Sequence, residues 1–111
     1  MKEKILINTR IIDPSQNMDE KGSIIIDANG KIKSIGKNIK RSDFPSSAEI
    51  IDLKNNITIP GIVDMKAFVG EPGYEYKENF RTLSQAALAG GVTSAVTMPN
   101  TDPVIDNVSI V

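Results

Sequence analysis

The chain has 111 residues, with 13 Lys and Arg against 14 Asp and Glu and a formal net charge of −1 at pH 7. This length allows one small domain, or one small domain with a piece of another. The small net charge gives no general attraction to nucleic acid or to an anionic membrane. No apolar run approaches the roughly 18 residues that a membrane-spanning helix needs. We therefore expect a cytoplasmic protein that binds neither nucleic acid nor membrane.

Histidine and cysteine are both missing from the sequence. Without cysteine there are no disulfides, no thiolate nucleophile and no cysteine-based zinc site. Without histidine the chain lacks the commonest metal-binding side chain and the usual acid–base group near neutral pH. Any chemistry proposed for this chain has to use other side chains.

Residues 1–58 are rich in β-branched residues and turn signals, which predicts a small β module. Asp13-Pro14 opens a turn cluster. Asn29-Gly30 predicts a type I′ hairpin turn, because both residues readily take positive φ angles. We expect short strands at 4–12, 23–27, 31–35, 48–53 and 56–59.

The pattern changes after Pro60-Gly61. Residues 62–69 and 92–98 have the apolar character of strands that are buried on both faces. Between them, residues 76–89 have helical spacing, with an apolar stripe formed by Phe80, Leu83 and Ala87. The order strand, helix, strand predicts a βαβ unit with a parallel strand pair.

The predicted fold class is therefore α/β with a β module. A βαβ unit without further strands leaves apolar strand faces and an unpaired sheet edge. Asp106-Asn107 resembles the start of another helix, yet only four residues follow it. We expect the sequence to be the front portion of a longer α/β chain, or a chain whose partner covers these surfaces.

Four ordered motifs resemble dihydroorotase, a family of the cyclic amidohydrolase superfamily. They are PGIVDM at 60–65, EPGYEYKE at 71–78, AGGVT at 89–93 and MPNT at 98–101. The segments 8–14 and 29–32 also look like the β-sandwich leader of that family, so the resemblance covers nearly the whole chain. It implies a partial, truncated amidohydrolase fold. Residues 1–58 would form part of a β-sandwich, and residues 59–111 the first strand, helix and second strand of a metal-dependent-hydrolase (β/α)8 TIM barrel.

The resemblance also implies a site. Family members hold zinc with a His-x-His pair at the end of the first barrel strand, and an Arg and an Asn grip the substrate carboxylate. Here the His positions carry Lys66 and Phe68, the Arg position carries Gly70, and only Asn100 is kept. A phenyl ring has no lone pair, and an ammonium donates but cannot accept. We therefore expect no metal ligand, no catalytic residue and no cofactor, with Asn100 as the single candidate substrate-binding residue.

Each of these residues also has a plainer interpretation. Asn100 lies in a turn-forming segment, and with the Arg position lost we favour a turn in which Asn100 bonds its own backbone. Lys66 could hold an anion at the end of its strand, although a lysine reaching into solvent is the ordinary outcome. An oxygen-ligand metal site is conceivable, but capping and turn roles are the more ordinary use of the acidic residues Asp64, Glu71, Asp102 and Asp106.

Three functions remain open. The first, which we favour, is a catalytically silent dihydroorotase-like protein of pyrimidine biosynthesis that acts as a scaffold for aspartate transcarbamoylase or associates with itself. The second is an active cyclic amide hydrolase, converting dihydroorotate to carbamoyl aspartate, whose site is completed by other sequence. The third is a fragment without a role of its own.

Overall fold

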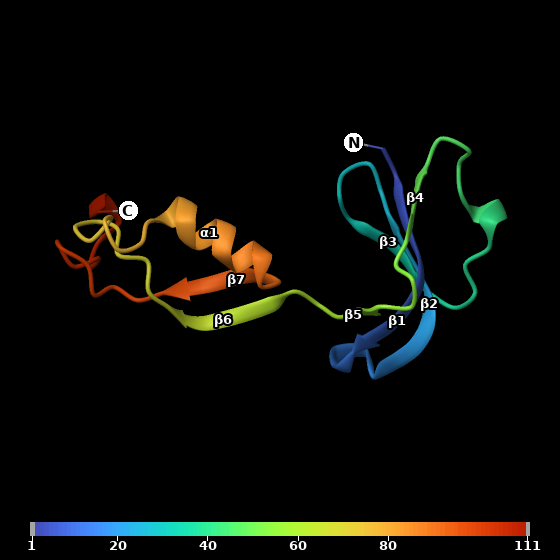
Figure 1. The fold of residues 1–111 in the computed structure, drawn as a ribbon, viewed down its shortest axis with the longest axis horizontal. Coiled ribbons are helices and arrows are strands. Elements are labelled where there is room, and N and C mark those ends of the chain that lie inside the picture. The colour runs from blue at the N-terminus through green and yellow to red at the C-terminus, as the bar shows by residue number, and fades with distance from the viewer. Residues whose placement is uncertain (1, 111) are drawn as a thin grey trace. The chain divides into compact units, whose positions relative to one another are not determined.

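The computed structural model describes residues 2–110 and divides into two compact units, Met1–Pro60 and Gly61–Val111 (Figure 1). Each unit has its own sheet. No helix within residues 2–110 is long and apolar enough to cross a membrane. The fold is a small α/β structure with one mixed sheet, one parallel strand pair and, among the described residues, one α-helix.

The first unit is a five-stranded mixed sheet built around its first strand. β1 pairs antiparallel with β2 and parallel with both β4 and β5, while β3 pairs with β2 at one edge. The predicted strands are all present, and the second is longer than expected. Their bounds are Lys4–Asp13 for β1, Met18–Ile26 for β2, Ile32–Gly36 for β3, Glu49–Asp52 for β4 and Ile57–Thr58 for β5, with short 3-10 turns at Pro14–Gln16 and Arg41–Asp43.

Isoleucines from β1 and β2 form the core of this sheet, which buries Ile5, Ile11, Ile24 and Ile25. A bulge in β1 places Thr9 inside, where its hydroxyl lies 2.7 Å from both the Asn56 carbonyl and the Thr58 hydroxyl. Asn8, on the bulge, takes a positive φ of 56°. The β module is therefore held by strand pairing and a small apolar core, with one buried hydroxyl fully bonded.

A hairpin joins β2 and β3, but the prediction of a type I′ turn is wrong. Only Gly30 has a positive φ, of 81°, and Asn29 does not. The Asp27 carboxylate accepts bonds from the backbone N–H groups of Asn29 and Lys31 at 2.8 and 2.9 Å. These bonds favour a three-residue loop that ends in a left-handed glycine, a common alternative to the two-residue turn.

The second unit is a βαβ unit, as predicted. β6 (Ile62–Ala67) and β7 (Val92–Thr97) pair in parallel, and α1 (Phe80–Ala89) connects them and runs beside β7 (Figure 1). A 3-10 turn at Val108–Ile110 follows. The Asn107 side chain accepts a bond from the Ser109 N–H at 3.0 Å, so Asn107 rather than Asp106 begins that turn.

The helix begins four residues later than the predicted start at residue 76. Residues 74–78 instead form turns, in which the Tyr74 carbonyl accepts from Lys77 N–H. Asn79 is extended at φ −131° and forms a capping box with Thr82, each side chain accepting from the other residue's backbone N–H. The sequence signal for this start is Asn-x-x-Thr, a variant of the usual capping pattern.

The prediction that both barrel-like strands are buried on both faces is wrong for the described residues. In β6, Val63 is 54% and Met65 is 72% exposed, and in β7 Val96 is 51% exposed. Among residues 61–110, Ala67 is the only buried residue of a strand. The physical reason is that two strands and one helix provide too few neighbours to cover an apolar sheet.

The turn after β7 is held by Thr101. Its buried hydroxyl donates to the Pro103 carbonyl at 2.9 Å, whereas no hydrogen bond of the Asn100 side chain occurs within residues 2–110. We expect Thr101→Val to lower the free energy of unfolding by about 1 kcal/mol, the usual net value of one hydrogen bond. Asn100→Ala, the neighbouring control, should stay within about 0.5 kcal/mol of wild type in urea unfolding. Equal losses in both variants would contradict this assignment.

Asp13 ends β1 and is buried with its carboxylate fully bonded. Hydrogen bonds from the Ser15 hydroxyl at 2.7 Å, and next from the Gln16 amide at 2.5 Å, lower the pKa of Asp13 below its ordinary value of 3.8. A lowered folded-state pKa gives stability that is fully present above the ordinary pKa and is lost as the pH falls through the folded value.

We therefore expect wild-type stability to decline below about pH 4 more steeply than that of Asp13→Asn, because the asparagine cannot be protonated in this range. Urea unfolding of both proteins from pH 7 to pH 2.5 measures the difference. Parallel curves over that range would show that Asp13 contributes no such stability.

Candidate functional site

The carboxyl ends of β6 and β7 meet at one edge of the second unit because the two strands are parallel. The Met98 N–H donates to the Ala67 carbonyl at 2.9 Å, which joins the two strand ends. The end of β6 and the residues after it therefore lie at this edge and include Lys66, Phe68 and Gly70. Asn100 follows the end of β7. In α/β folds this is the edge at which sites are usually built.

Lys66 lies in a bulge of β6. Asp64 pairs with Ala95 and Ala67 with Thr97, so two residues of β6 stand opposite one residue of β7. The Asp64 carboxylate accepts a bond from the Lys66 backbone N–H at 2.9 Å, which stabilises the bulge. The Lys66 side chain is exposed, and no ion pair within residues 2–110 involves it.

Side chains beyond Lys66 alternate between the packed and the exposed side. Ala67 and Val69 are buried, Val69 completely, whereas Phe68 is 40% exposed. Gly70 is buried at a positive φ of 74°. The edge therefore presents an ammonium and a phenyl ring, followed by a residue without a side chain.

This donor set does not fit a zinc ion. Zinc in proteins is held by thiolate sulfur, imidazole nitrogen or carboxylate oxygen, and neither Lys66 at neutral pH nor Phe68 supplies such an atom. Within residues 2–110 no group of three or more histidine, cysteine, aspartate or glutamate residues is arranged to hold a metal ion. Lys66 and Phe68 therefore do not supply the paired zinc ligands that the motif resemblance implies at these positions.

Three of the four acidic residues considered as oxygen ligands have local structural partners. Asp64 accepts from the Lys66 N–H, and Glu71 accepts from the Phe80 N–H at the first turn of α1, 2.9 Å away. Asp106 accepts from the side chain of Asn107. Capping and turn roles, the plainer interpretation, account for these three carboxylates, and the role of Glu71 at the helix start suits the helix dipole.

Asn100 occupies an exposed position after β7. The prediction that its side chain bonds its own backbone is wrong, since the turn is formed by the Thr101 N–H and hydroxyl and by the Pro99 carbonyl. No hydrogen bond joins Asn100 to Lys66 in the part of the chain that the structure describes. Within residues 2–110 the Asn100 side-chain amide therefore makes no hydrogen bond that would hold it in the turn.

The loop between β6 and α1 is well bonded. Glu75 accepts from the Gly73 N–H at 3.0 Å, and this bond lowers the pKa of the Glu75 carboxyl. Lys77 places its ammonium 5.1 and 5.5 Å from the ring centres of Tyr74 and Tyr76, within the range of cation–π contacts. The two tyrosines therefore face a lysine of their own loop.

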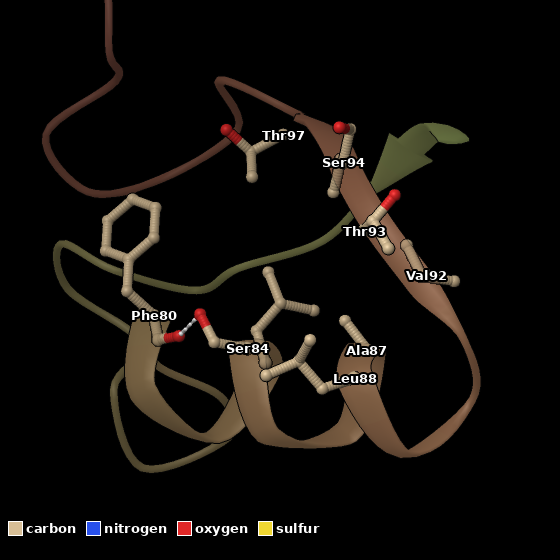
Figure 2. A pocket seen from close by; sticks show the side chains of 10 residues that line it. Phe80, Ser84, Ala87, Leu88, Val92, Thr93, Ser94 and Thr97 are labelled. Atoms are coloured by element: carbon tan, nitrogen blue, oxygen red, sulfur yellow. Dashed lines mark hydrogen bonds between the residues drawn. The ribbon is translucent and has the colours of Figure 1, made fainter. Parts of the chain in front are cut away.

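A hollow of about 450 Å³ lies between α1 and β7, and Figure 2 shows the side chains that line it. Ser84, which could offer a hydroxyl, donates it to the Phe80 carbonyl at 2.6 Å. None of the lining side chains ionises near neutral pH; they are Phe80, Leu83, Ser84, Ala87, Leu88, Val92, Thr93, Ser94, Ala95 and Thr97. The hollow can take an apolar neighbour but offers no acid–base or metal chemistry.

No protein-family model matches this chain. Proteins named dihydroorotase match it at 44% identity over 93% of the chain in Pelobacter propionicus, at 48% over 91% in Geotalea daltonii and at 45% over 100% in Aquifex aeolicus. The chain spans 23% of the first two relatives and 25% of the third.

The resemblance to dihydroorotase motifs is therefore confirmed. Identity of 44–48% extends over nine tenths or more of the chain, well beyond the motifs at the strand ends. Over its whole length this chain is therefore similar to about a quarter of these relatives, and it corresponds to an N-terminal dihydroorotase portion.

Proposed function

We propose that this chain forms the N-terminal part of a dihydroorotase-like protein of pyrimidine biosynthesis that binds no zinc at its first barrel strand and does not hydrolyse dihydroorotate. The observation that carries the proposal is the end of β6, where an exposed lysine and a half-exposed phenylalanine stand at the two positions at which the resemblance implies the zinc-binding pair. The relationship to dihydroorotases supports the pathway.

The same proposal assigns each of the two units to a part of the amidohydrolase fold. Residues 1–58 would belong to a β-sandwich, and residues 59–111 would be the first strand, helix and second strand of a TIM barrel. The parallel β6–α1–β7 arrangement supports this assignment. So do the exposed apolar residues of β6, because a barrel strand is covered by strands and helices on both faces.

Loss of the zinc pair has a direct chemical consequence. Hydrolysis of an amide at neutral pH needs an activated water, and a bound zinc ion activates water by lowering its pKa. An ammonium at the same place cannot bind zinc or accept a proton from water, and a phenyl ring cannot do so either. A protein that keeps the fold without this chemistry would act by binding, and we propose aspartate transcarbamoylase as the bound partner.

The metal test uses the longest natural polypeptide that carries this sequence. After incubation with zinc and removal of free metal, mass spectrometry should find far less than one zinc ion per chain, with no turnover of dihydroorotate. A matched double variant, Lys66→His with Phe68→His, should retain more zinc than wild type, because imidazoles restore the lone pairs. Stoichiometric zinc with turnover in the wild type would reject the proposal and favour an active cyclic amide hydrolase.

The partner test mixes the same polypeptide with aspartate transcarbamoylase of the same organism. The two proteins should elute together in size-exclusion chromatography at micromolar concentrations, while an unrelated protein of similar size should not join them. Separate elution would reject the scaffold role. Separate elution together with absent zinc and absent turnover would favour the third interpretation, a fragment without a role of its own.

A further inference from the structure

The backbone at Gly70 has a conformation that side chains disfavour. Its φ of 74° lies in the left-handed region, which glycine adopts freely and other residues rarely do. Gly70 is also buried and follows Val69, which is completely buried. Gly70 occupies the position at which the family resemblance implies an arginine, so its surroundings decide whether a side chain can return there.

The space next to Gly70 is filled by backbone. A Cβ atom placed on Gly70 would lie 2.6 Å from the Glu78 carbonyl oxygen and 2.9 Å from the Tyr74 carbonyl oxygen. Both distances are shorter than atoms in contact tolerate, and a carbonyl cannot rotate away as a flexible side chain can. The Phe68 ring approaches the same point to 3.2 Å.

Those two carbonyls belong to a loop, residues 70–79, that is bonded at several points. The Tyr74 N–H donates to the Gly70 carbonyl at 2.6 Å. Further along, the Asp102 N–H donates to the Pro72 carbonyl at 3.0 Å, and Glu71 accepts from the first turn of α1. Moving the loop away from Gly70 would therefore strain or break bonds to both the helix and the segment after β7.

We infer that the 70–79 loop excludes any side chain at position 70. This chain then has no group there to bind a substrate carboxylate, and replacing Gly70 with arginine disrupts the loop instead of restoring a binding residue. The inference rests on the proposed function and deepens it, because the lack of activity then depends on the backbone around Gly70 as well as on the side chains of Lys66 and Phe68.

The test compares Gly70→Asn with Gly91→Asn in the longest natural polypeptide that carries this sequence. Both glycines have positive φ angles, 74° and 80°, but nothing lies within 4 Å of a Cβ placed on Gly91. Asparagine tolerates the left-handed region better than most residues, so the pair separates steric exclusion from backbone preference. Trypsin cleavage after Lys77 reports on the loop, and cleavage after Lys33 in the first unit is the internal reference.

We expect cleavage after Lys77 to be about tenfold faster in Gly70→Asn than in wild type, the change in local opening that ordinary overpacking produces. Gly91→Asn should cleave at the wild-type rate, and cleavage after Lys33 should not change in either variant. Equal rates after Lys77 in the two variants would overturn the inference. That outcome would leave the zinc and turnover measurements untouched, so failure of the inference and failure of the proposed function are distinguishable.

Discussion

A zinc site needs ligand atoms with lone pairs that are held in a fixed arrangement. In a parallel strand pair the carboxyl ends of both strands lie at one edge, and the ligands implied by the resemblance would stand there. In this chain the residues that reach the edge from β6 are Lys66 and Phe68. Neither offers a lone pair at neutral pH, and the whole sequence contains no histidine to take over the task. The proposals on activity and partner depend on this single chemical constraint.

Several polar groups near the carboxyl ends of β6 and β7 are bonded within the protein. One carboxylate oxygen of Asp64 accepts a hydrogen bond in the bulge that carries Lys66. One carboxylate oxygen of Glu71 accepts a hydrogen bond at the start of α1. Gly70 is enclosed by the carbonyls of its own loop. Acidic and backbone groups that would surround a ligand in an open site are thus bonded to the protein itself, which favours a structural use of this edge.

Much of the fold could be predicted from the sequence because alternation and helical spacing are local signals. The strands of the first unit and the parallel βαβ order followed from them. The helix start was misplaced, since Asn79 and Thr82 form a capping box from an unusual residue pair. The absence of a zinc pair at Lys66 and Phe68 stays a prediction. The enclosure of Gly70 could not be predicted from the sequence, because it arises from carbonyls four and eight residues away.

The most direct measurement is crystallographic. Crystals of the longest natural polypeptide, grown with zinc and measured on both sides of the zinc absorption edge, locate any bound zinc by its anomalous signal. The account predicts no anomalous peak within bonding distance of residues 66–70. A peak at the end of β6, with Lys66 or a neighbouring atom in its coordination shell, would contradict it.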